Sequence, residues 1–172
     1  MLLLKLLQGP LSPPEISKYT SQQIARIVYA VGLIKKSRLL IGNPDRLQSF
    51  LQLLWRESTD RKRLMTYDSI ALAQVAFGFS MMQLENPRLL RPFAEEAVKP
   101  HRLRNTRGKS LVNLLDSLNC TKYRNKNHVE ILSEAAVGHV TFLPTFALPR
   151  LLHAWGHFRY SNQAHVRAVL SE

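Results

Sequence analysis

The stretch KYRNKNHVEIL, from Lys122 to Leu132, returns in altered form 37 residues later as RYSNQAHVRAVL, from Arg159 to Leu170. Both copies have Tyr, Asn, His and Val at the same steps. The segments before them, Ser110 to Asn119 and Ala147 to Gly156, have apolar residues at helical spacing and superimpose at the same offset. The recurring unit is therefore a first helix, a connector and the start of a second helix.

Two weaker copies precede these. IARIVYAVGL (Ile24 to Leu33) is followed by GNPDRLQSFLQLLW, and IALAQVAFGF (Ile70 to Phe79) is followed by ENPRLLRPFAEEAV. An Asn side chain accepts hydrogen bonds from the free amides of a first helical turn. Proline is well tolerated at the first helical position, which Pro44 and Pro87 would occupy. We therefore expect an Asn to begin the second helix of each unit, namely Asn43, Asn86, Asn125 and Asn162.

The first helices are expected to end at residues that suit the left-handed conformation beyond a helix terminus. Thr20, with Gln23 three residues later, has the pattern of a capping box at the start of the first of these helices. Thr66 or Asp68, and Thr106, are the equivalent starting residues of the next two units. The first helices are expected to end near Gly32, Gly78, Asn119 and Gly156.

The sequence predicts an all-α fold, an α-solenoid of about four helical-hairpin repeats of 37–43 residues. Apolar and polar residues do not alternate at period two over a stretch long enough to predict a sheet. Residues 1–19 are expected to form an N-terminal tail, and one domain to cover residues 20–172, with units at approximately 20–58, 66–99, 106–139 and 144–172. Repeats bury their apolar faces between neighbours, so the last unit, without a polar capping helix, is an expected docking surface for neighbouring proteins.

The charge and composition of the chain indicate which classes of molecule it could bind. The net charge is +12, from 24 Lys and Arg against 12 Asp and Glu, and such a surface attracts polyanions, nucleic acid first. A single cysteine, Cys120, allows no internal disulfide and fits a reducing compartment. No apolar run reaches the 18 residues that predict a membrane span. The opening MLLLKLLQGPLSPPE has one basic residue, Lys5, and is a weak import or secretion signal.

The repeats resemble a known group. The pattern LPRLLHAWGHFRY followed by NQAHVRAVL resembles the organellar octotricopeptide and heptatricopeptide repeats and the repeats of the FAS-activated serine/threonine kinase family. The resemblance is best over Leu148 to Leu170 and weak over Ile24 to Trp55. It implies RNA binding in mitochondria or chloroplasts, in transcript processing or within divergent ribosomes. It does not include the RAP domain that many of these proteins carry, and a generic tetratricopeptide-like interaction protein remains an alternative.

Basic residues gather in four clusters, two in the connectors between units and two in the turns within hairpins. They are expected to lie on opposite edges of the solenoid and to contact RNA phosphates. The candidate RNA-binding residues are Lys35, Lys36, Arg38, Arg61, Lys62, Arg63, Lys99, Arg102, Arg104, Arg107, Lys109, Lys122, Arg124, Lys126 and Arg159.

Aromatic residues beside these charges have two interpretations. Tyr123, Tyr160 and His157 stand next to basic residues and could stack on unpaired bases. Because a tyrosine recurs at the same step of the repeat, packing across the hairpin is the favoured interpretation.

Catalytic and ligand motifs are incomplete. TRGKS, Thr106 to Ser110, resembles the end of a phosphate-binding loop, but Leu103 stands where that motif needs glycine and no strand precedes it. His153 and His157 have the spacing of two metal ligands without a third. Adjacent Glu95 and Glu96 point apart on a helix and offer no acid and base pair.

We therefore expect a non-catalytic protein with no cofactor, metal or small-molecule substrate. The expected function is that of an rRNA-binding structural component of an organellar ribosome, in the mitochondrial matrix or another organelle. The alternatives are a protein-interaction subunit of another mitochondrial complex and a transcript-binding RNA-processing factor. Four repeats are few for the last of these, because one base per repeat would specify only a short site.

Overall fold

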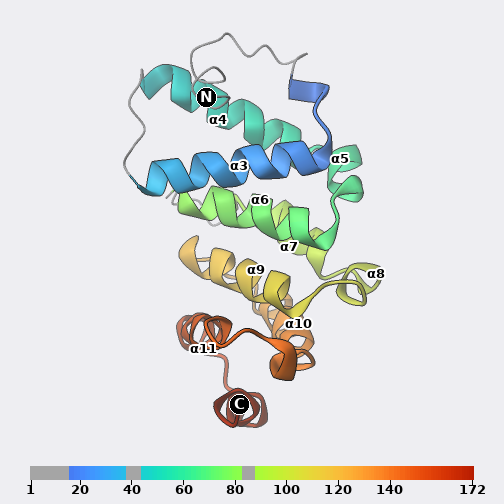
Figure 1. Ribbon diagram of the computed structural model, residues 1–172, viewed down its shortest axis with the longest axis vertical. Coiled ribbons are helices and arrows are strands. Elements are labelled where there is room, and N and C mark those ends of the chain that lie inside the picture. The colour runs from blue at the N-terminus through green and yellow to red at the C-terminus, as the bar shows by residue number, and fades with distance from the viewer. Residues whose placement is uncertain (1–15, 38–43, 83–87) are drawn as a thin grey trace.

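The computed structural model describes residues 16–37, 44–82 and 88–172 (Figure 1). Within these ranges every regular element is helical, and the prediction of an all-α fold is confirmed there. The elements are α3 (Ser21–Lys36), α4 (Pro44–Thr59), α5 (Arg61–Thr66), α6 (Ser69–Met81), α7 (Arg91–Ala97), α8 (Pro100–Leu103), α9 (Gly108–Cys120), α10 (Lys126–Val137), the 3-10 helix η1 (Val140–Phe142), α11 (Ala147–Phe158) and α12 (Gln163–Leu170).

The first helices of the four units pack against one another in chain order. Helix α3 contacts α6, α6 contacts α9, and α9 contacts α11, which Figure 1 shows as successive helices along the longest axis. Each of them also contacts the second helix that follows it, α4, α7, α10 or α12. Each of the four helices therefore contacts both a helix distant in sequence and the helix that follows it.

Gly32 and Gly78 are expected near the ends of their helices. They lie inside α3 and α6, which continue to Lys36 and Met81. A Cβ added at Gly32 would stand 2.9 Å from the Cα of Gly78 and closer still to its carbonyl oxygen. A Cβ added at Gly78 would stand 2.6 Å from the carbonyl oxygen of Val28. The two glycines are therefore needed for the close approach of two helix backbones, and neither has a positive φ.

The left-handed residues are instead Lys122, with φ 55°, and Arg159, with φ 54°. Helix α9 ends at Cys120 and α11 at Phe158, so Asn119 and Gly156 still belong to the helices. In both turns the next residue, a tyrosine, donates its amide to a carbonyl five residues back, at 3.0 Å, as in a Schellman motif. The equivalent positions of two repeats thus end their first helices in the same way.

The recurring Tyr, Asn and His form the start of each following helix. Asn125 caps α10 and Asn162 caps α12, each accepting from the backbone amide of the recurring histidine. Tyr123 Oη lies 2.9 Å from His128 Nδ1, and the equivalent pair of the next unit is 2.6 Å apart. Burial raises the pKa of both tyrosines, so each hydroxyl stays protonated beside its histidine ring. Packing, the favoured interpretation of these tyrosines, is supported.

Other predicted helix starts have mixed outcomes. The Thr20 capping box is confirmed, and Asp68 caps α6 by accepting from the amide of Ala71 at 2.7 Å. Thr106 does not cap α9: the cap position is Arg107, which makes no side-chain cap hydrogen bond. Asn43 and Asn86 lie outside the described residues. Helix α4 begins at Pro44 as expected, whereas α7 begins only at Arg91.

Candidate nucleic-acid interface

The basic clusters lie at the two ends of the helix pairs. We call the segments 35–37, 88–91, 121–126 and 159–163, where a first helix ends and a second helix begins, the turn edge. The segments 60–69, 99–109 and 139–146, which join one pair to the next, are the connector edge. Figure 1 shows α5 and α8 of the connector edge projecting on one side of the molecule.

The turn edge has exposed cations next to helix starts. Lys36, Arg124, Lys126 and Arg159 are exposed, as is Lys122, and Lys35 is half-buried in the last turn of α3. Arg38 lies outside the described residues. The first turns of α10 and α12 open at this edge, and the positive end of a helix dipole adds to the attraction for anions.

The connector edge is continuous from one unit to the next. Arg102 of α8 donates to the carbonyl oxygens of residues 64, 65 and 67, and Ser69 donates to the carbonyl of Asn105 at 3.3 Å. Gly108 at the start of α9 packs against His139 of the next connector. Lys109 also contacts this next connector, because its Nζ lies 5.6 Å from the ring centroid of Phe146. These contacts join three connectors into one surface.

Arg102 is a predicted RNA-binding residue whose guanidinium binds other groups of the same chain. Its Nε is 2.9 Å from Glu96 Oε1, whose side chain is only 5% exposed. Lys99 pairs with the other oxygen of Glu96 at 2.5 Å but is itself 47% exposed. Burial opposes the charge of Glu96, yet its hydrogen bonds with Lys99 and Arg102 outweigh that effect and lower its pKa. Arg102 therefore compensates a buried charge instead of facing solvent.

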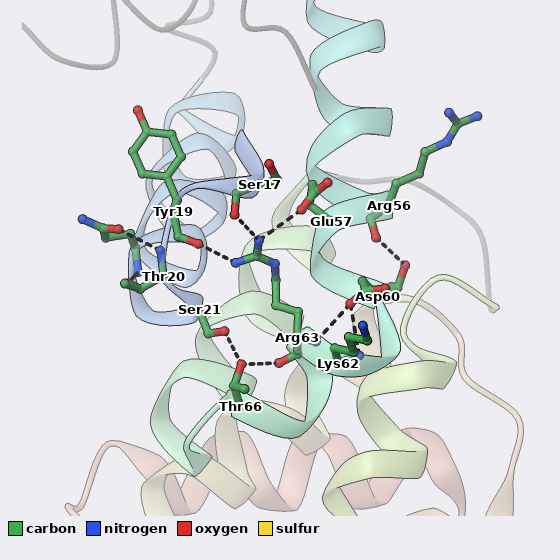
Figure 2. Close-up of polar contacts among 12 residues, drawn as sticks. Ser17, Tyr19, Thr20, Ser21, Arg56, Glu57, Asp60, Lys62, Arg63 and Thr66 are labelled. Atoms are coloured by element: carbon green, nitrogen blue, oxygen red, sulfur yellow. Dashed lines mark hydrogen bonds and ion pairs between the residues drawn. The ribbon is translucent and has the colours of Figure 1, made fainter. Parts of the chain in front are cut away.

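Arg63 is a second predicted RNA-binding residue whose guanidinium binds other groups of the chain, as Figure 2 shows. Its guanidinium donates to the carbonyl oxygens of Tyr19 at 2.6 Å and Ser17 at 3.1 Å and pairs with Glu57 at 3.1 Å. It thereby fastens residues 16–19, which the sequence analysis assigns to the tail, to α5. Ile16 is fully buried beside them. The guanidinium groups of Arg63 and Arg102 are thus engaged by carbonyl and carboxylate oxygens of the chain itself.

The remaining cations of the connector edge are exposed. Arg61 and Lys62 lie in the first turn of α5, whose amides Asp60 caps at 3.0 and 3.1 Å. Arg104, Arg107 and Lys109 follow one another across the start of α9. Together with the partly paired Lys99, they keep the connector edge positive.

The acidic residues are largely used inside the fold. Asp60 and Asp68 are helix caps. Glu57, Glu95, Glu96 and Asp116 form ion pairs with arginine or lysine. Glu130 and Glu134 are exposed on α10 and lie near Tyr160 of the turn edge, whose pKa is raised by burial and by these two carboxylates. The excess of basic residues in the sequence is therefore concentrated at the two edges.

Exposed aromatic residues are a feature that the sequence analysis misses. Phe142 is 85% exposed and Phe146 is 58% exposed, both on the connector edge. The tyrosines that the sequence suggests for stacking face their own histidines. The one available signal was the pair of prolines, Pro144 and Pro149, which breaks the strand character of this segment and marks it as a loop.

Other chemistry is sparse in the part of the chain that the structure describes. His153 and His157 lie edge to face with ring centroids 4.7 Å apart, and no group of three metal-binding side chains occurs among the described residues. Cys120 is exposed at the end of α9, and partial burial together with Asp116 raises its pKa. No described helix is both long and apolar enough to cross a bilayer.

No protein-family model matches the chain, and a search of curated proteins finds no match. The resemblance to organellar RNA-binding repeats therefore depends on the sequence pattern, and the function has to be argued from the two edges.

Proposed function

We propose that this chain is a non-catalytic RNA-binding structural component of a mitochondrial ribosome. Its basic residues at the turn edge and the connector edge neutralise phosphates of folded rRNA. The supporting observation is the distribution of charge among the described residues: most carboxylates serve as helix caps or pair with arginine or lysine, while exposed lysines and arginines gather at the helix ends. Such contacts give affinity that depends strongly on salt and little on sequence.

The proposal includes the architecture. The chain order of packing, from α3 through α6 and α9 to α11, is the order expected of a small α-solenoid. In that arrangement the helix ends form two long edges that contact separate RNA segments, and the last unit docks on a neighbouring protein through α12, where Leu170 is 68% exposed. The organellar location follows from the resemblance to octotricopeptide and heptatricopeptide proteins.

Removing connector charges should weaken RNA binding more than removing equal charge elsewhere. The variant Arg104→Gln, Arg107→Gln, Lys109→Gln loses three exposed cations of the connector edge. We expect the slope of log affinity against log salt to fall by about 2, because each lost phosphate contact removes roughly 0.7 to 0.9. Filter binding of a structured RNA over a salt series measures this slope.

The matched control is Arg26→Gln, Arg56→Gln, Arg167→Gln, which removes the same charge from exposed positions on α3, α4 and α12. Its slope should change by less than that of the connector variant. Equal effects of the two variants would mean that net charge alone drives binding. Absence of wild-type binding to structured RNA at low salt would reject the function.

A protein-interaction subunit of another mitochondrial complex is the second candidate, and a groove favours it. The groove lies between α4 and α7 and has a volume of about 760 Å³. Its lining combines the apolar residues Leu51, Trp55, Leu89 and Pro92 with the polar and charged residues Gln48, Gln52, Arg56, Arg88, Arg91 and Glu95. Apolar grooves of this size accept ligands or side chains of a partner. A chain that binds no RNA but co-purifies stoichiometrically with a respiratory complex would support this candidate instead.

A further inference from the structure

We infer that Phe142 and Phe146 stack on unpaired bases of RNA, while Arg104, Arg107 and Lys109 hold the phosphates on either side. This inference rests on the proposed RNA binding and names the part of the surface and the kind of RNA that it takes. It assigns unpaired nucleotides, in a loop, bulge or single strand, to the connector edge.

The two rings are presented to solvent by a segment that is itself anchored. Phe142 ends η1, whose first residue, Val140, is only 6% exposed and belongs to the core. The amide of Phe142 donates to the carbonyl of His139 at 2.9 Å, and that of Ala147 donates to Pro144 at 2.7 Å. Phe142 and Phe146 therefore project from a held turn, and little conformational freedom is lost when a base packs on them.

Basic side chains flank the rings. Lys109 lies over the ring of Phe146 at 5.6 Å, and Arg107 precedes it by two residues at the cap position of α9. The carboxylates of the connector edge are otherwise engaged: Asp60 and Asp68 cap helices, and Glu96 is buried with Arg102. A surface that holds exposed rings together with cations suits the bases and phosphates of a single strand.

Duplex RNA does not fit this surface as well. In a duplex the faces of the bases are stacked on one another, so exposed phenyl rings have no partner, whereas an unpaired base offers a free face. The turn edge lacks this feature, since Tyr123 and Tyr160 are bonded to His128 and His165. The two edges thus bind different parts of the RNA: the connector edge binds unpaired nucleotides, and the turn edge contacts phosphates only.

The test compares three RNAs of equal length, single-stranded, fully paired, and paired with an internal loop, by fluorescence anisotropy with the full chain. The variant Phe142→Ala, Phe146→Ala should bind the single-stranded and looped RNAs roughly tenfold or more weakly, because stacking on an aromatic side chain is lost. Its affinity for the duplex should remain that of the wild type. Phe142→Trp should retain the affinity and show quenching of the new indole by unpaired RNA alone.

The control Leu33→Ala removes an exposed apolar side chain from α3 and should leave all three affinities unchanged. Thermal unfolding followed by circular dichroism verifies that the phenylalanine variant is folded. If the wild type binds RNA and the variant binds unpaired RNA equally well, the inference is wrong while the proposed function stands. If the wild type binds none of the RNAs, the proposed function fails as well. Loss of flotation with phosphatidylserine vesicles, with RNA affinity unchanged, would assign the rings to a lipid surface and overturn the inference.

Discussion

Replacing Arg102 with alanine should lower the free energy of unfolding by about 3 kcal/mol. The substitution removes one of the two cations that compensate Glu96, and the carboxylate stays buried at 5% exposure. It also leaves the carbonyl oxygens of Leu64, Met65 and Tyr67 without their guanidinium donor. The effect stays at the low end of the range for broken buried pairs because Lys99 still reaches Glu96. Urea unfolding followed by circular dichroism measures it.

Arg104→Ala is the matched control, since Arg104 is exposed two residues further along and should change the stability by no more than about 0.5 kcal/mol. If the two variants are equally stable, Arg102 does not hold the connector.

The same site predicts a pH dependence. The pKa of Glu96 is lowered in the folded chain, so its ion pairs contribute stability above the ordinary glutamate pKa of about 4.3, and this contribution is lost as the pH falls through the lowered folded value. The stability difference between the wild type and Glu96→Gln should therefore shrink below about pH 4. A difference that stays constant between neutral and strongly acidic pH would contradict this assignment.

Gly78→Ala should destabilise the chain by about 2 kcal/mol or more. The added Cβ would meet backbone atoms of Val28 and Tyr29 at 2.6 to 2.8 Å, and backbone at a helix crossing cannot rotate away as a side chain can. The helices α3 and α6 must then separate, which disturbs the packing of Val28, Val75 and their neighbours, and overpacking of this kind costs about 1–3 kcal/mol or more. The better helix propensity of alanine offsets less than about 1 kcal/mol.

Gly156→Ala tests the same substitution without the crossing. Gly156 is exposed within α11 and has no atom within 4 Å of an added Cβ, so the alanine variant should be more stable than the wild type by about 0.5–1 kcal/mol. Midpoints of urea unfolding compare the two variants directly. A Gly78→Ala variant that is as stable as Gly156→Ala would mean that α3 and α6 do not approach closely.

Local rules were enough to predict much of the fold. Asn125 and Asn162 cap helices because a short side-chain carbonyl can reach a first-turn amide, and their spacing reveals the repeat. The alternation of apolar stretches and connectors predicts the order of the helices. The tyrosine of each turn could be interpreted as packing because it recurs at the same step of the repeat, and in the structure it lies within hydrogen-bond distance of the recurring histidine.

Contacts between residues distant in sequence could not be predicted. Gly32 and Gly78 resemble helix ends in sequence, and only the position of one helix against the other shows that they are contact points. Lys122 and Arg159 take the left-handed position that we assigned to glycine or asparagine, since the hydrogen bonds of the turn hold them there. Arg63 and Arg102 look like the other cations of their clusters, and their carbonyl partners lie 35 to 46 residues away.

The sequence therefore predicts which residues of the candidate site are basic and in which loops they lie. It does not predict which of their side chains face solvent. Sequence alone places basic residues in loops, and the structure divides them into those committed to the fold and those facing solvent. The sequence does not reveal the exposure of Phe142 and Phe146, because phenylalanine is a residue type that is most often buried.

The most direct test of the account is to identify what contacts residues 99–109 in the assembled state. Ultraviolet cross-linking in cells that make the protein, followed by purification under denaturing conditions, yields the attached RNA and the peptides that carry it. We expect ribosomal RNA of an organelle, attached to peptides that contain Lys99 to Lys109 and to the peptide with Phe142 and Phe146. Cross-links to protein alone at these peptides, with no RNA attached to the chain, would contradict the proposed function.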